Sequence, residues 1–175
     1  MKKLFILVAA MLAVGTVSAQ KFARVNLQEI VVAMPEFEEA QKNLEAFGKD
    51  LQEQMEQIQV EFNNKLADFQ KNQNTMAASI KQMKQQELEQ LQQRYGEFQQ
   101  IAQQDFQKKQ AELFEPVQKK AQDAVNKISK AAGYIAVFDT SAQNLAYFDE
   151  AQLTDIAPLV KKELGISDKP ATPAN

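Results

Sequence analysis

The 175-residue chain contains no cysteine, no histidine and no tryptophan. Without histidine and cysteine it cannot form Ser/His/Asp or Cys/His nucleophilic sites, and nearly every zinc-binding arrangement is excluded too. Without cysteine it has no disulfide bonds to stabilise a small fold. The sequence therefore predicts a protein that is not an enzyme, that holds no cofactor or metal ion, and that is stabilised by packing or association.

Proline and glycine are scarce, with five residues of each. No proline lies between Pro35 and Pro116, and only Gly48 and Gly96 interrupt that stretch. Residues that favour helices, mainly Gln, Glu, Lys, Ala and Leu, dominate it. We therefore expect a helical arm over residues 35–131. Pro116 is expected to kink its helix, the alternative being that it ends one helix and begins another.

Two stripes of apolar residues run along this stretch in steps of three and four, with one step of seven in the second, as on one face of a helix. The first comprises Phe37, Ala40, Leu44, Phe47, Leu51, Met55, Ile58, Phe62, Leu66 and Phe69, and the second Leu88, Leu91, Tyr95, Phe98, Ala102, Phe106, Leu113, Val117, Ala121, Ala124 and Ile128. Polar residues separate the stripes, and we expect a chain reversal within 72–80. The alternative is a single helix of about 95 residues, near 140 Å long.

Charge is unevenly distributed along the predicted arm. Residues 36–61 hold eight acidic and two basic side chains, whereas residues 108–130 hold six lysines and three acidic side chains. An acidic outgoing helix beside a basic returning helix favours an antiparallel hairpin, although two unrelated solvated faces would show the same charges. The formal net charge is −3. This value argues against a nucleic-acid-binding surface.

The first nineteen residues have the pattern of a cleaved export signal. Lys2 and Lys3 precede an apolar run from Leu4 to Val14, and Val17-Ser18-Ala19 supplies a small-x-small cleavage site. The run is shorter than the roughly 20 apolar residues that span a membrane. We expect cleavage after Ala19, export, and no stable membrane insertion. Cleavage would change the net charge from −3 to −5 because Lys2 and Lys3 are lost.

Short strand-like segments flank the predicted hairpin. Residues 22–27 alternate in polarity, and residues 134–138 follow Gly133, which is a natural helix stop. Residues 145–148 are expected to complete a β-hairpin with 134–138.

The end of the chain is expected to hold one more helix. Thr154 resembles an N-cap for a helix that ends at Gly165, and residues 167–175 resemble a disordered tail. Residues 20–34 and 132–166 would then form a small body beside the arm. The predicted fold class is α+β, mostly α.

Such a body, with three short strands and two short helices, is near the size at which a single core is marginal. Its strands carry more apolar surface than those helices cover, and their open edges favour association. We therefore expect a homo-oligomer whose core comprises Val25, Leu27, Ile135, Val137, Leu145 and Tyr147.

Several short motifs occur in a characteristic order around the predicted hairpin. They are Ala23 to Leu27, Met34-Pro35, Leu113 to Val117, Gly133 to Asp139 and Leu153 to Ile156. With them the chain resembles the Skp/OmpH-like family of periplasmic chaperones over nearly its whole length after residue 19. The resemblance implies a homotrimer with a small barrel-like body of strands from three chains. Three hairpin arms would surround a cavity that holds unfolded outer-membrane proteins without ATP.

The chain departs from that family in charge, because the best-known members are basic and this chain is acidic. No site for lipopolysaccharide or an anionic membrane is therefore carried over from the resemblance.

Residues near the predicted reversal suit the binding of many different apolar segments. Flexible methionine and flat phenylalanine side chains repack around different partners. We expect client contacts from Phe62, Phe69, Met76, Ile80 and Met83, although each of these also fits a helix–helix seam. The nearby Lys65, Lys71, Lys81 and Lys84 are expected to form a basic rim that attracts acidic clients, or else to be ordinary solvated lysines.

Two other functions fit a long helical hairpin. One is a structural coiled-coil spacer of the cell envelope, which predicts fully covered seams and no cavity. The other is an envelope adaptor, which normally needs further domains on both sides of its hairpin.

Overall fold

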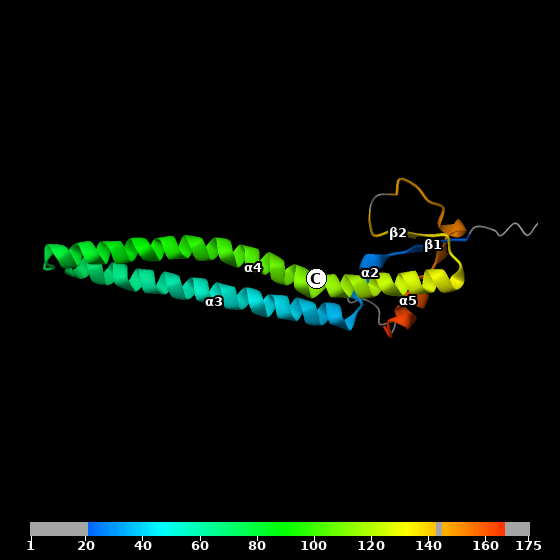
Figure 1. The fold of residues 1–175 in the computed structure, drawn as a ribbon, viewed down its shortest axis with the longest axis horizontal. Helices are drawn as coiled ribbons and strands as arrows, with labels where there is room; N and C mark the ends of the chain where they lie inside the picture. Colours follow the sequence, from blue (N-terminus) through cyan, green and yellow to red (C-terminus); the bar gives the residue numbers. More distant parts are fainter. Residues whose placement is uncertain (1–20, 143–144, 167–175) are drawn as a thin grey trace, which may run out of the picture. The chain divides into compact units, whose positions relative to one another are not determined.

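The computed structural model describes residues 21–142 and 145–166. Their elements are β1 (Phe22–Val25), α2 (Leu27–Val32), α3 (Pro35–Asn72), α4 (Ala78–Ala132), β2 (Ala136–Asp139), the 3-10 helix η1 (Glu150–Gln152), β3 (Thr154–Asp155) and α5 (Ala157–Glu163). The predicted fold class, mostly helical with a small strand body, is confirmed (Figure 1). The expected export signal (1–19) and disordered tail (167–175) lie outside the described residues.

The chain separates into two compact units. The arm unit comprises Val31–Lys120. The body unit comprises the described residues up to Ile30 and those from Ala121 onward. Residues 121–131, which the sequence assigns to the arm, therefore belong to the same unit as the strands.

The arm unit is an antiparallel helical hairpin. The rings of Phe37 in α3 and Phe114 in α4 lie 5.3 Å apart, and farther along the arm Lys65 Nζ lies 2.8 Å from Glu87 Oε1. As the residue numbers in α3 rise, those of the contacting residues in α4 fall, so the two helices run in opposite directions (Figure 1). Residues 73–77 connect the helices, and the sequence predicts the reversal within 72–80.

The ends of the long helices follow from local chemistry. Pro35 opens α3 at a position whose N–H would have no intrahelical partner. Gly133, with φ of 73°, follows the end of α4, and the Tyr134 N–H donates to the Ser129 carbonyl over 3.0 Å. This left-handed arrangement is a helix stop that glycine adopts without strain, as the sequence predicts. Helix α4 continues through Pro116 and does not break there.

The first stripe and the second stripe up to Val117 lie in the arm unit, whereas Ala121, Ala124 and Ile128 of the second stripe belong to the body unit. Every stripe residue is buried or half-buried. Within the arm, however, Ala40, Ile58, Leu91, Ala102 and Val117 are the stripe residues that are fully buried. Two helices alone cannot enclose larger side chains from all sides, so much of the seam stays partly open to solvent.

The body contains a three-stranded sheet in the order β2-β1-β3, and both strand pairs are parallel. The expected hairpin between residues 134–138 and 145–148 is therefore wrong, because the third strand is Thr154–Asp155. The Asp139 carboxylate accepts hydrogen bonds from the Ser141 N–H (2.9 Å) and hydroxyl (2.7 Å), and this turn follows β2 directly. Strands β2 and β3 each pair with β1, which lies between them, and not with each other.

Two predicted boundaries are also wrong. Leu27 does not end the first strand but begins α2, because Asn26 Oδ1 accepts a hydrogen bond from the Glu29 N–H (3.1 Å) and caps that helix. Thr154 is not an N-cap but lies in β3, and α5 begins three residues later. There Asp155 Oδ1 accepts a hydrogen bond from the Ala157 N–H over 2.9 Å.

The body unit has its own core of fully buried apolar residues, which are Ala23, Val25, Ile30, Ala121, Ala124, Val125, Ile156, Ala157 and Val160. Helix α5 is joined to α2 by the Lys161–Glu29 ion pair (2.7 Å) and to the end of α4 by Lys127–Glu163. These contacts gather β1 and the three helices around one small core.

Candidate functional site

The five residues expected to bind client segments lie along the half of the arm nearest the connection. Phe62, Phe69 and Met76 are half-buried. Ile80 and Met83, at the start of α4, are 44% and 52% exposed. The structure thus places the first three partly in the seam, whereas the last two offer apolar surface to solvent.

Farther from the connection, two adjoining depressions share Gln59 and Tyr95. Their volumes are about 320 Å³ and 520 Å³. We call the two together the mid-arm groove; it is lined by Gln52, Met55, Glu56, Ile58, Gln59, Val60, Phe62, Asn63, Gln92 and Tyr95. Apolar and aromatic side chains line it beside carboxamides, and Glu56 is its one ionisable carboxylate.

Sequence reasoning did not identify this groove. Its signal is the spacing of Gln52, Gln59 and Asn63, which puts three carboxamides on one side of α3 next to the seam. In a chain so rich in glutamine, that spacing alone does not separate a groove from a solvated helix face.

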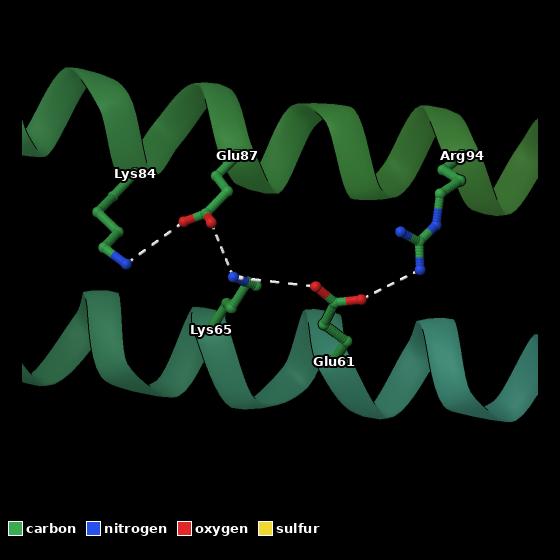
Figure 2. A network of polar contacts seen from close by, with 5 residues as sticks. All are labelled: Glu61, Lys65, Lys84, Glu87 and Arg94. Carbon is green, nitrogen blue, oxygen red and sulfur yellow. Dashed lines mark hydrogen bonds and ion pairs between the residues drawn. The ribbon is translucent and has the colours of Figure 1, made fainter.

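Near the groove, a network of ion pairs connects α3 and α4 (Figure 2). We call it the ladder; it comprises Glu61, Lys65, Lys84, Glu87 and Arg94. Lys65 Nζ lies 2.8 Å from Glu87 and 3.9 Å from Glu61, Lys84 Nζ lies 3.3 Å from Glu87, and Arg94 lies 3.1 Å from Glu61. Hydrogen bonds, first from Lys65 and then from Lys84, lower the pKa of Glu87. The hydrogen bond to Glu87 raises the pKa of Lys65.

Two of the four lysines expected to form a basic rim take part in the ladder. Lys65 and Lys84 are paired with carboxylates, so part of their charge is balanced within the arm. Lys71 is exposed and Lys81 half-buried, and in the part of the chain that the structure describes neither makes an ion pair. The basic character near the connection therefore comes mainly from Lys71 and Lys81.

The base of the arm pairs acidic with basic side chains, as expected from the charge distribution. Glu36 in α3 contacts Lys120 in α4, and the hydrogen bond from Lys120 lowers the pKa of Glu36. Lys109 Nζ lies 6.0 Å from the centre of the Phe47 ring. The Glu36–Lys120 pair thus joins the two helices at the base of the hairpin, whereas Glu38 and Glu53 pair with lysines of α3 itself.

The residues expected to form an oligomer core fall into two groups. Val25 is 3% exposed and lies in the chain's own core, and Val137 is half-buried opposite Ala23 in the sheet. Leu27 and Leu145 are also half-buried, in α2 and outside the strands respectively. Ile135 and Tyr147 are 64% and 84% exposed. Only the last two present large free apolar surface.

Residues 21–142 and 145–166 contain neither a metal-binding cluster nor a membrane-spanning helix. Within these ranges no cluster of three or more His, Cys, Asp or Glu side chains is arranged to hold a metal ion. None of the helices formed by these residues has the length and apolar character needed to cross a membrane.

Comparison with known proteins identifies the fold and the family. A crystal structure of an OmpH-like protein from Caulobacter crescentus matches with a TM-score of 0.71 at 12% identity, over 83% of each chain. The chaperone protein Skp of Yersinia enterocolitica is 28% identical over 155 residues, which is 89% of this chain and 92% of that protein. Skp of Vibrio cholerae is 27% identical over 139 residues, or 79% of this chain and 82% of that protein.

The model of the family described as outer membrane protein (OmpH-like) matches residues 21–164. This match includes all three strands, the whole hairpin and the whole of α5. The chain therefore belongs to the OmpH-like family.

Proposed function

We propose that this protein is an ATP-independent holdase chaperone of the periplasm that keeps unfolded outer-membrane proteins from aggregating. Family membership and the relatives named as Skp chaperones support chaperone activity toward outer-membrane proteins. The export signal expected at residues 1–19 supports the compartment.

The observation that carries the proposal is the apolar surface of the arm. Large apolar side chains are exposed there along both helices: Val60 (49%), Ile80 (44%), Met83 (52%) and Ile101 (54%). Side chains of this kind contact apolar segments of many sequences because they impose little geometry on the partner. A holdase needs such contacts and no chemical step.

A homotrimer is part of the proposal. The sheet has three short strands, and its outer strands β2 and β3 leave edges that are unpaired within the chain. The exposed Ile135 and Tyr147 add apolar surface to the same unit. Open edges and apolar surface favour association of identical chains. We expect three such bodies to assemble and three arms to enclose the client.

The test combines assembly with activity. Protein lacking residues 1–19 is analysed by sedimentation, and a urea-unfolded outer-membrane β-barrel protein is diluted into it without ATP. We expect a trimer that suppresses light scattering. The double variant Ile80→Ser/Met83→Ser should remain trimeric and suppress scattering less than its matched control, Gln82→Ser/Gln86→Ser. Scattering equal to that of the client alone would contradict the proposed function.

A further inference from the structure

We propose that the mid-arm groove is a subsite for an extended peptide segment that carries an aromatic side chain next to a lysine or arginine. The inference rests on the proposed function because the segment would belong to a client chain. Beyond the proposed function, the inference states where on the arm a client segment binds and which charge that segment carries.

The floor of the groove suits an aromatic ring. Ile58, Phe62 and Tyr95 line the smaller depression, and Met55 with Val60 extends the apolar lining into the larger one. Phe62 and Tyr95 are half-buried and Val60 is 49% exposed, so part of this apolar surface is free to be covered. An inserted ring gains offset or edge contacts with Phe62 and Tyr95 in addition to the burial of its area.

The rim of the groove suits an extended backbone. Gln52, Gln59, Gln92 and Asn63 each carry an amide that donates and a carbonyl oxygen that accepts. Among the residues that the structure describes, none of these four carboxamides makes a hydrogen bond within the chain. An unfolded segment has unpaired N–H and C=O groups, and the rim offers partners for both.

The charge around the groove favours a basic neighbour. Glu56 is exposed and, within residues 21–142 and 145–166, makes no ion pair. The segment 36–61 that contains it holds eight acidic side chains and two basic ones. Glu36, Glu38, Glu53 and Glu61 of this segment are ion-paired, so the free negative charge at the groove is that of Glu56. A lysine or arginine beside the aromatic side chain complements it.

On the ladder side of α3, another depression shares Glu56 and Val60 with the groove and is also lined by Glu61 and Lys65. Glu61 lies two residues beyond Gln59 and so about 200° around α3. Its carboxylate is already paired with Arg94 and Lys65. What distinguishes the groove is its aromatic lining, because Phe62 and Tyr95 line the groove and do not line that depression.

The first experiment measures the charge preference on the full chain without residues 1–19. A short fluorescein-labelled Thr/Ser peptide with one Phe flanked by lysines is titrated by fluorescence anisotropy against the same peptide with glutamates. We expect tighter binding of the lysine peptide. Glu56→Lys should reduce that preference about five-fold, the factor that corresponds to an exposed pair of about 1 kcal/mol. Glu45→Lys, on the same helix about 16 Å away, should leave it nearly unchanged.

The second experiment locates the bound peptide. A photo-crosslinking amino acid placed at Gln59 should capture the lysine peptide, whereas the same group at Gln90, an exposed position that does not line the groove, should capture little. Equal capture at both positions, or equal binding of both peptides, would overturn the inference. If the β-barrel client is still kept soluble in that case, the holdase proposal stands without this subsite. If the peptide binds as expected but the client aggregates, the holdase proposal fails and the subsite remains.

Discussion

The body and the arm bury their apolar residues to very different extents. In the body, short elements from both ends of the described chain surround a core in which Ala23, Ala121, Ile156 and Val160 are completely enclosed. In the arm, two much longer helices face only each other, and the seam is mostly half-buried. Most side chains in this two-helix layer keep one flank open, although a few such as Ile58 and Leu91 are buried.

Because of this difference in burial, the residues that contribute most to folding stability are not the residues that can contact a partner. Fully buried positions contribute most to the free energy of unfolding, because removing their atoms leaves a cavity. Half-exposed apolar positions contribute less to folding and retain surface that a partner can cover. The proposed function therefore assigns client binding to the arm, and the buried core of the body contributes mainly to stability.

Removal of the distal arm is the change with the largest expected effect on activity. Deleting residues 62–95 leaves Glu36 paired with Lys120 and leaves the body residues intact. We expect the body to fold and assemble but suppression of client aggregation to be lost, as measured by sedimentation and light scattering. A structural spacer would only become shorter. Equal activity of the full-length and shortened proteins would show that the arm is not where clients bind.

Truncation of one isoleucine in each unit should separate their contributions to stability. Ile156→Ala, at a fully buried position, should cost about 2–5 kcal/mol of unfolding free energy. Ile80→Ala, at a position 44% exposed, should change it by less than about 0.5 kcal/mol. Urea unfolding at one fixed protein concentration gives both values. Equal losses would mean that Ile80 is enclosed in the assembled protein.

The Asp139 carboxylate should stabilise the body to an intermediate degree. Partial burial raises the pKa of Asp139, but hydrogen bonds from Ser141 and from the Leu27 N–H outweigh it and hold the pKa below its ordinary value of 3.8. Asp139→Ala should cost about 1 kcal/mol, as for other lost caps. Asp139→Asn keeps an acceptor oxygen and should recover part of the loss.

The same residue should make the stability depend on pH. Because the folded pKa is depressed, the contribution is fully present above pH 3.8 and is lost as the pH falls through the lower folded value. The difference in melting temperature between the natural protein and Asp139→Ala should therefore shrink in that acidic range. A difference that grows on acidification would contradict the role of the charge.

The ladder should have the smallest effect. Glu87→Gln removes the shared partner of Lys65 and Lys84, but these side chains are solvent-accessible and such pairs are weak. We expect a slight fall in melting temperature that disappears at high salt, with Glu89→Gln as the control. The depressed pKa of Glu87 means that the effect is present above pH 4.5 and fades as the pH falls. A large effect that persists at high salt would indicate a different role.

The sequence predicts the arm well because its signals are local and repeated. The steps between Phe37 and Phe69 define one helix face many times over, so a single exception changes nothing. Gly133 marks the end of α4 through its own backbone preference. The hairpin follows from the two stripes and their charges.

The body was predicted less well because its strands are short and its signals few. Residues 145–148 have strand-forming side chains, yet Thr154 and Asp155 pair with β1 instead. Pairing between segments so distant in the sequence is a tertiary contact, which local strand propensity does not encode. The mid-arm groove was not predicted because the glutamines that line it, such as Gln52 and Gln92, cannot be told apart in the sequence from the many solvated glutamines of the arm.

The position of β1 in the middle of the sheet sets the order in which the molecule can be completed. Ala23 pairs with Val137 on one side and Thr154 on the other, so the central strand is synthesised first and its neighbours nearly last. The hairpin closes through a short local connection, which has a low entropic cost. The sheet, by contrast, cannot form until β2 and β3, more than 100 residues after β1, have been synthesised. During synthesis the arm can therefore form before β2 and β3 exist, so the segment that carries apolar surface is available before the sheet has closed.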